Sequence, residues 1–386
     1  MLDCVRTFDA LRQNDVRFFA GVPDSLLKHL CACIQDRCAA NDHVITPNEG
    51  NAVALVAGHH LATGELGLVY MQNSGLGNAV NPLVSLAGAG VYSIPMLLLI
   101  GWRGEPGRPD EPQHLQQGQV TLGLLEQLEI PHLVLPDSEG AAQRALLHAA
   151  AEARRLSAPF AIVVRKGTFA DYAPTTPTRE RYSMGREEVV QQLLASLEAE
   201  DAVVSTTGKT SREVFEYRAK HDEPPRDFLT VGSMGHASQI ALGVALARRD
   251  RRVVCLDGDG AALMHMGSLA AIGQSDARNL VHVVLNNGAH DSVGGQPTVG
   301  FGIDIAGIAA ACGYSTVHSV ATASDLHRAW VEIAGDGPHF LEVRVKRGAR
   351  SDLGRPTSTP AENKGDFMQF IAASHKQAVA AHSEAQ

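Results

Sequence analysis

The hydrophobic residues of this chain gather in short runs separated by longer stretches of mixed polarity. The runs are rich in Val, Ile, Leu and Phe and recur in both halves of the chain. They lie at residues 16–19, 43–45, 66–71, 96–100, 132–135, 160–164, 202–205, 228–231, 253–256, 281–285 and 340–345. Such runs are typical of strands buried on both faces of a parallel sheet, with helices in the intervening stretches. The pattern predicts an α/β fold with two doubly wound parallel sheets, one in each half.

The boundary between the halves is expected at residues 172–184. This segment contains Pro174 and Pro177 and has no apolar period, which is typical of a linker. At 386 residues, the chain also exceeds the length that one hydrophobic core usually supports. We therefore expect one domain at 1–171 and a second at 185–386.

Two polar motifs follow predicted strands of the second half. Asp259 lies in the run 256–260 (Leu-Asp-Gly-Asp-Gly), and Asn287 lies in the run 285–288 (Leu-Asn-Asn-Gly). Open α/β sheets bind ligands at the carboxyl ends of their strands. If the two strands are neighbours, a carboxylate and a carboxamide oxygen converge on one point. Mg²⁺ prefers oxygen ligands and takes several of them from phosphate and water.

The paired motifs resemble the diphosphate-binding motif of thiamine diphosphate enzymes. The resemblance implies that Asp259, Asn287 and the backbone oxygen of Ala289 bind Mg²⁺. It also implies that residues 1–171 bind the pyrimidine ring of thiamine diphosphate and that residues 185–386 bind its diphosphate. The residues expected to contact the cofactor in the second half are Thr206, Thr207, Gly208, Gly232, Met234, Gly258, Gly260 and Ala261.

The same resemblance requires a glutamate in the first half, and Glu49 follows a predicted strand at the start of an Ala-rich helix. A carboxylate in the first turn of a helix is also favoured by the helix dipole, which is the purely structural explanation. The resemblance implies that Glu49 hydrogen-bonds the pyrimidine ring and takes part in catalysis. The proton-handling residues of pyruvate-type relatives are missing here, so Asp24, Ser25 and His114 are further catalytic candidates.

Several strings resemble the phosphonopyruvate and sulfopyruvate branch of these decarboxylases, which lacks a third domain. They lie at residues 21–27, 101–107, 110–114, 205–211 and 292–298. The resemblance implies conversion of 3-phosphonopyruvate to phosphonoacetaldehyde and CO₂, in phosphonate biosynthesis. Sulfopyruvate decarboxylation and carboligation of 2-oxo acids remain the alternatives, and a cofactor-binding module without activity is a third.

The anionic tail of such a substrate needs cationic or hydrogen-bonding partners. Arginine suits it, because its planar guanidinium matches tetrahedral oxyanions. The candidates are Gln113, Arg103, Lys209, His290, Arg350, Arg355 and Lys364. Residues 348–365 are rich in Gly, Pro, Ser and Thr, and we expect them to form a lid.

The run 205–211 contains Gly208-Lys209-Thr210, which looks like the end of a P-loop. A P-loop needs a glycine five positions before the second glycine, and Val203 stands there. Nucleotide hydrolysis is therefore not expected, and neither is a nicotinamide oxidoreductase, because no Gly-x-Gly-x-x-Gly follows the first predicted strand.

Composition narrows the class of partner. The net charge of −9 argues against a nucleic-acid surface. No apolar run reaches the length of a membrane span, and the amino terminus has no signal-peptide pattern, so we expect a cytoplasmic enzyme. The six cysteines have no trusted metal spacing, and disulfides are not expected. Cys31, Cys33 and Cys38 are expected to pack as small apolar residues of a helix. The resemblance implies a homodimer or homotetramer with active sites between chains.

Overall fold

The computed structural model describes residues 1–175 and 180–384, with side chains as far as residue 373. The chain divides into two compact units. The first comprises Met1–Thr178 and Ser292–Pro297, and the second comprises Arg179–Asp291 and Thr298–Gln386. Residues 176–179 of the expected linker lie outside the described residues. The start of that linker contacts the first unit, where the Tyr172 amide donates to His29 Nδ1 at 3.1 Å.

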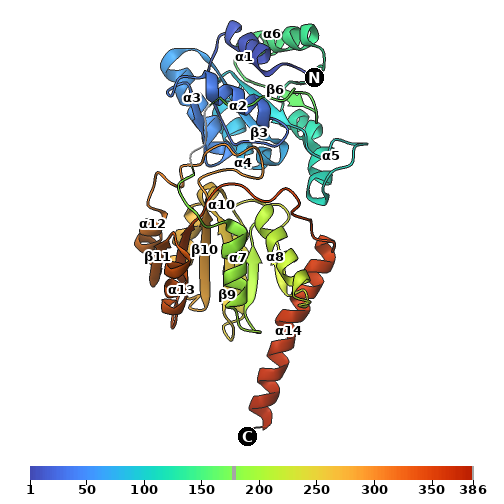
Figure 1. Cartoon of the computed structure of the whole chain (residues 1–386). Coiled ribbons are helices and arrows are strands. Elements are labelled where there is room, and N and C mark those ends of the chain that lie inside the picture. Colours follow the sequence, from blue (N-terminus) through green and yellow to red (C-terminus); the bar gives the residue numbers. More distant parts are fainter. Residues whose placement is uncertain (176–179, 385–386) are drawn as a thin grey trace. The chain divides into compact units, whose positions relative to one another are not determined.

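The first unit is built on a parallel six-stranded sheet with the order β2-β1-β3-β4-β6-β5. Its strands are β1 Val16–Gly21, β2 His43–Ile45, β3 Leu66–Gln72, β4 Met96–Gly101, β5 His132–Val134 and β6 Pro159–Val164 (Figure 1). Its helices are α1 Cys4–Gln13, α2 Lys28–Arg37, α3 Glu49–Thr63, α4 Leu76–Pro82, α5 Pro112–Gln127 and α6 Glu139–Leu156, with a 3₁₀ turn η1 Asn73–Gly75 and a π turn η2 Leu83–Ala87.

Alternation along the strands divides the core of this unit into two layers. Leu68 and Tyr70 of β3 face one layer, which α1, α2 and α6 cover. Val69 and Met71 of the same strand face the other, which α3, α4, η2 and α5 cover. Because side chains of a strand point alternately to opposite faces, a strand buried on both sides reads as a continuous apolar run. This is why the sequence pattern located these strands.

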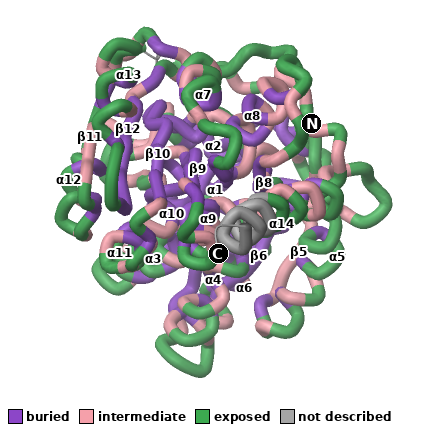
Figure 2. Tube along the Cα trace, turned by 90° about the horizontal axis from the view of Figure 1, so that it is seen from below, coloured by how far each residue is buried: buried purple, intermediate pink, exposed green. Residues whose placement is uncertain are grey.

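The second unit repeats the architecture with the strand order β11-β12-β10-β9-β7-β8, again all parallel. Its strands are β7 Ala202–Ser205, β8 Asp227–Leu229, β9 Val253–Gly258, β10 Leu280–Asn286, β11 Thr316–Val320 and β12 His339–Arg344. Its helices are α7 Arg186–Ala195, α8 Lys209–Lys220, α9 Ala237–Ala247, α10 Asp259–Met264, α11 Gly267–Gly273, α12 Ile305–Cys312, α13 Ala323–Glu332 and α14 Pro360–Glu384. Figure 2 shows the central strands β9 and β10 as buried.

The expected fold class, two doubly wound parallel sheets without a middle domain, is confirmed. One strand, β11, was not predicted. It lies at the sheet edge and only its last residue, Val320, is buried, so its run Thr-Val-His-Ser-Val lacks a continuous apolar signal. The expected lid at 348–365 also overlaps α14, because residues from Pro360 onward are helical. Among the described residues, none of the helices combines the length and apolar character of a bilayer crossing.

Candidate functional site

The strand ends that carry the two polar motifs are neighbours. Strands β9 and β10 pair in parallel, with Leu285 opposite Gly258. Asp259 begins α10 directly after β9, and Asn287 follows β10. The backbone N–H of Asn287 donates to Asp259 Oδ1 at 3.4 Å. The structure therefore brings the predicted carboxylate and carboxamide together at one edge of the sheet.

Asp259 has the surroundings of a cation ligand. Its side chain is buried, and the Thr298 hydroxyl donates to Oδ2. Burial raises the pKa of Asp259 to about 6, while hydrogen bonds from Thr298 and from backbone amides oppose the rise. A buried carboxylate beside a carboxamide is an oxygen donor set that fits Mg²⁺.

Asn287 is held at both ends of its carboxamide. Its Nδ2 donates to Asp291 Oδ2 at 2.7 Å, and its Oδ1 accepts from the Ala289 amide at 3.0 Å. Ala289 is buried next to Asn287, and its carbonyl stays a predicted ligand. Thr298 and Asp291 did not stand out in the sequence, because each is an ordinary polar residue in a loop string.

Three predicted residues converge on the start of α10. A Cβ on Gly260 would lie 3.1 Å from His290 Nδ1 and 3.2 Å from Met234 Cε. Met234 lies between β8 and α9, Gly260 follows β9, and His290 follows β10. The segments after three strands therefore meet at the start of α10. A side chain at position 260 would crowd His290 and Met234, so glycine suits this close approach. Amides at a helix start suit a phosphate, as expected for Gly258, Gly260 and Ala261.

His290 is a neutral imidazole at physiological pH, since burial lowers its pKa to about 4. It therefore offers hydrogen bonds and no positive charge to an anionic ligand.

The loop after β7 is ordered by its own hydrogen bonds. The Thr206 amide donates to the Leu256 carbonyl at 2.8 Å, and the Thr207 hydroxyl donates to the Val231 carbonyl at 2.8 Å. Gly208 has a φ of +96° and precedes α8, which begins at Lys209. The loop thus lies next to β9, and its Thr207 contacts the strand end that leads to Gly232.

In the first unit, Glu49 opens α3 as predicted, and the Asn48 side chain caps this helix by accepting from the Asn51 amide. Glu49 is buried, and burial raises the pKa of its carboxyl. Asn78 Nδ2 donates to Oε2 at 2.8 Å, and a Cβ on Gly75 would come within 2.3 Å of Oε1. Desolvation of this kind favours the protonated form of a carboxyl over its anion.

Asp24, Ser25 and Arg103 form a second cluster at the ends of β1 and β4. Asp24 is fully buried; its Oδ2 accepts from the Leu26 amide at 2.9 Å and its Oδ1 has no hydrogen-bond partner among the described residues. Burial raises the pKa of Asp24 to about 6, and the nearby Arg103 opposes the rise. Arg103 donates to Ser25 Oγ at 3.0 Å and pairs with Asp110 through two nitrogens.

His114 lies in the first turn of α5, where burial lowers its pKa to about 4, and its neighbour Gln113 is half-buried. A Cβ on Gly104 would come within 1.9 Å of the His114 carbonyl, so the loop that follows β4 lies directly against this helix. His114 is therefore close to the Arg103 loop, as its electrostatic interaction with Arg103 also indicates.

The expected lid is attached to the second unit in this structure. Arg350 forms ion pairs with Glu187, Glu216 and Asp352. Asn363, inside α14, donates to the Asp227 carbonyl and accepts from the Leu229 amide. Arg355 also has an interaction partner, and Lys364 is exposed.

One buried cluster was not expected from the sequence. Cys255, Asp257 and His282 place one ligand atom each within 4.8 Å of one another. His282 hydrogen-bonds Asp257 Oδ2 at 3.3 Å and the Tyr314 hydroxyl at 3.1 Å. The six cysteines are all free, as predicted.

Comparison with known proteins shows which family each half of the chain resembles. Residues 6–128 match the family described as "Thiamine pyrophosphate enzyme, N-terminal TPP binding domain", and residues 206–343 match the corresponding C-terminal TPP binding domain. Phosphonopyruvate decarboxylase of Streptomyces viridochromogenes is 39% identical over 91% of this chain and 90% of its own length. The Streptomyces hygroscopicus enzyme of the same name is 39% identical over 91% of this chain and 89% of its own. Sulfopyruvate decarboxylase of Methanosarcina acetivorans is 26% identical over 95% of this chain and 97% of its own.

Proposed function

The chain belongs to the thiamine pyrophosphate enzyme family, and from this membership we propose that it decarboxylates 3-phosphonopyruvate to phosphonoacetaldehyde and CO₂, in phosphonate biosynthesis. The observation that carries the proposal is the match to phosphonopyruvate decarboxylase, which covers 91% of this chain. It includes both the Glu49 site and the Asp259–Asn287 site.

The residues that would hold the cofactor follow from the geometry of each unit. Asp259, Asn287 and the Ala289 carbonyl would bind Mg²⁺. The amides at the start of α10 and the loop at residues 206–208 would hold the diphosphate, and Glu49 would contact the pyrimidine ring. When bound, thiamine diphosphate supplies the electron sink that a 2-oxo acid lacks for loss of CO₂.

Glu49 has the properties of a proton carrier toward that ring. Its pKa is raised by burial, and Asn78 Nδ2 donates to its Oε2 at 2.8 Å. Gly75 leaves room for the other oxygen, because any side chain there would collide with it. The chain thus orients a carboxyl whose pKa is raised by burial, which favours its protonated form relative to an exposed glutamate.

Asp24 is our first candidate for the group that returns a proton to the product. Its pKa of about 6 lies near physiological pH, and its Oδ1 is buried without a partner in the described chain. Ser25 and Arg103 extend the same cluster, and the neutral His114 is the second candidate. A group whose pKa lies near the working pH serves best as a general acid or base.

The phosphonate tail requires positive charge. Arg103 and Arg350 already pair with carboxylates, so a phosphonate would have to compete with Asp110 or with Glu187 and Glu216. We therefore place Lys209, at the start of α8, ahead of both, with Arg355, Lys364, Gln113 and His290 as the remaining candidates.

We propose a homodimer or homotetramer in the cytoplasm, in which Glu49 of one chain and Asp259 of another share a cofactor. The basis for the shared cofactor is the family resemblance. The basis for the cytoplasm is the six free cysteines, which suit a reducing compartment.

The proposal is tested by CO₂ release from the purified protein with Mg²⁺ and thiamine diphosphate. Phosphonopyruvate, sulfopyruvate and pyruvate are supplied in parallel, and the aldehyde product is identified. We expect the highest kcat/KM with phosphonopyruvate. A preference for sulfopyruvate would favour the alternative to which the full-length match with the Methanosarcina acetivorans relative points. Product formation only after an aldehyde acceptor is added would instead indicate a carboligase.

A further inference from the structure

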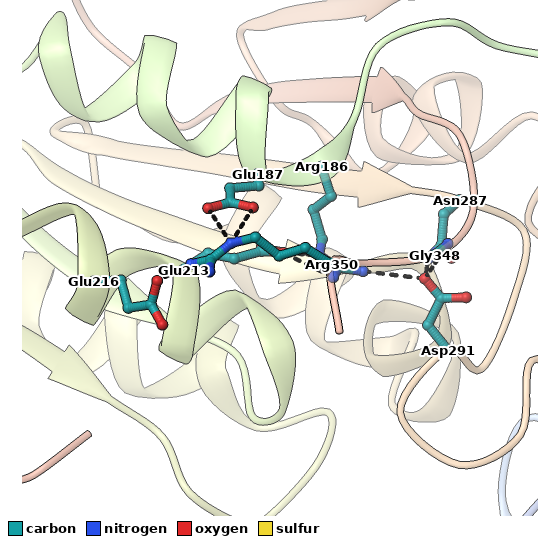
Figure 3. A network of polar contacts seen from close by, with 8 residues as sticks. All are labelled: Arg186, Glu187, Glu213, Glu216, Asn287, Asp291, Gly348 and Arg350. Atoms are coloured by element: carbon teal, nitrogen blue, oxygen red, sulfur yellow. Dashed lines mark hydrogen bonds and ion pairs between the residues drawn. The ribbon is translucent and has the colours of Figure 1, made fainter. Parts of the chain in front are cut away.

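We propose that Asp291 is a positioning residue, which fixes the carboxamide of Asn287 for cation binding and ties it to a strap formed by residues 346–350. Figure 3 shows the polar network that links Asn287, Asp291, Gly348 and Arg186. The inference rests on the proposed function, because it takes Asn287 to be a ligand of Mg²⁺.

Three hydrogen bonds meet at one carboxylate oxygen of Asp291. Asp291 Oδ2 accepts from Asn287 Nδ2 at 2.7 Å, from the Gly348 amide at 2.9 Å and from Arg186 Nη1 at 3.3 Å. A carboxylate only accepts hydrogen bonds, so the side of the carboxamide that faces Asp291 must be its NH₂ group. The oxygen of Asn287 then points away from Asp291. A carboxamide oxygen has two lone pairs, and the Ala289 amide uses one of them, which leaves the other for a cation.

The position of Asp291 is fixed in turn by a buried ion pair. Arg186, the first residue of α7, donates to both oxygens of Glu213 on α8, with distances of 2.8 and 2.9 Å. The side chains of Arg186 and Glu213 are 7% and 1% exposed. Removing one partner of a buried pair leaves a charge without compensation, so this geometry is costly to disturb. Two helices outside the cation site therefore determine where Asp291 lies.

The strap adds a third attachment. The Lys346 backbone N–H donates to the Met184 carbonyl at 2.8 Å, and Arg347 Nη2 donates to the Gly288 carbonyl at 3.2 Å. Gly348, with a φ of +90°, turns its amide toward Asp291. The strap thus contacts the loop from Asn287 to Asp291 at two places, at Gly288 near its start and at Asp291 at its end. Arg350 anchors the strap to Glu187 and Glu216 (Figure 3).

The arrangement has a consequence for metal binding. Groups that orient a metal ligand typically change metal affinity by roughly 10 to 100-fold when they are removed. A loosened loop should also discriminate less between Mg²⁺, which demands regular octahedral geometry, and the larger Ca²⁺. A role limited to holding the fold would change stability and leave both properties unaffected.

The test compares the variants Asp291→Ala and Asp291→Asn with the wild-type full-length protein. Mg²⁺ and Ca²⁺ are titrated in the presence of thiamine diphosphate, and binding is followed by calorimetry without substrate. For Asp291→Ala, we expect the Kd for Mg²⁺ to rise roughly 10 to 100-fold and the preference for Mg²⁺ over Ca²⁺ to narrow. Asp291→Asn keeps an acceptor oxygen of the same size, so it should give a smaller rise. Asp276→Ala is the matched control, because Asp276 also pairs with arginines of this unit but does so at its surface.

The outcomes separate this proposal from the proposed function. Suppose that wild-type protein binds Mg²⁺ with thiamine diphosphate and that the Kd of Asp291→Ala for Mg²⁺ lies within twofold of the wild-type Kd. Asp291 is then not a positioning residue, whatever effect the substitution has on Tm. Should Asp291→Ala fail to fold, an unchanged Kd in Asp291→Asn leads to the same rejection. If the wild type itself shows no Mg²⁺-dependent binding of the cofactor, the cofactor assignment fails, and this inference fails with it.

Discussion

Two buried carboxyls of the first unit, Glu49 and Asp24, differ in their local surroundings, which is why we propose different roles for them. Glu49 receives a side-chain hydrogen bond from Asn78, whereas Asp24 receives only backbone amides and keeps one oxygen without a partner in the described chain. Burial raises the pKa of both. The first is suited to a fixed contact with a ring nitrogen and the second to a proton exchanged with a mobile product.

Replacing Glu49 by glutamine should remove the proton carrier and keep its shape. We expect Glu49→Gln to lower kcat by about 10² to 10⁴, because general acid–base catalysis contributes on that scale. The affinity for thiamine diphosphate, measured directly by calorimetry, should change much less. Glu65→Gln serves as the control, since Glu65 follows the same helix and is half-exposed. Equal losses of cofactor affinity and kcat in Glu49→Gln would indicate a binding role only.

Asp24 should make the stability of the protein depend on pH. Its pKa of about 6 in the folded protein lies above the ordinary value of 3.8, so the folded protein accommodates the protonated form better than the anion. The contribution of Asp24 to the free energy of unfolding is then fully present below about pH 4, and it is lost as pH rises through about 6. We expect the free energy of unfolding of Asp24→Asn, relative to wild type, to increase by about 2 to 3 kcal/mol between pH 4 and pH 7.5.

Urea unfolding of both proteins at a series of pH values measures this difference. Asp259, whose pKa is also raised to about 6, is present in both proteins, so its titration cancels in the comparison. A difference that stays constant with pH would contradict the assignment to Asp24.

At the scale of an element, α5 shows how closely a helix must approach the loop that carries site residues. A Cβ on Gly118 of α5 would lie 1.7 Å from the Gly104 carbonyl. The Trp102 indole also donates to the Gly118 carbonyl at 2.8 Å. The loop of Arg103 therefore depends on a glycine in the middle of a helix, where glycine is otherwise unfavourable.

The same helix contains a matched pair of substitutions. A Cβ on Gly123 would meet nothing within 4 Å. We expect Gly123→Ala to stabilise the protein by up to about 1 kcal/mol, through helix propensity alone. Gly118→Ala should destabilise it by roughly 1 to 3 kcal/mol, because the added methyl group forces the backbone apart. Thermal unfolding checks both signs, and a stabilising Gly118→Ala would refute the close approach.

At the scale of the whole molecule, the proposed sharing of sites between chains predicts complementation. Glu49→Gln and Asp259→Asn should each be inactive as pure proteins. In a dimer formed from one chain of each, one site would carry both changes and the other neither. Mixing the two after denaturation and refolding should therefore restore up to about a quarter of wild-type activity, since half of the random dimers are mixed.

Sedimentation should show that the active mixture is oligomeric. Without any recovery in mixed oligomers, Glu49 and Asp259 of the same chain would have to share a cofactor.

Continuous apolar runs allowed nearly all of the strands to be located from the sequence. The exception, β11, lies at a sheet edge and is partly exposed, so its polar residues hide it. The position of Asp259 and Asn287 after strands was also evident, because a polar motif that interrupts a buried run marks a strand end.

Only the tertiary structure decided which strands are neighbours and which side chains meet. The pairing of β9 with β10 brings Asp259 to Asn287, and residues far apart in sequence, such as Arg186, Asp291 and Gly348, converge on one oxygen. Local patterns specify strand ends through burial and turn chemistry, which depend on near neighbours in the chain. Long-range contacts, and the pKa values that burial produces, depend on how the folded elements pack, and no short stretch of sequence contains that information.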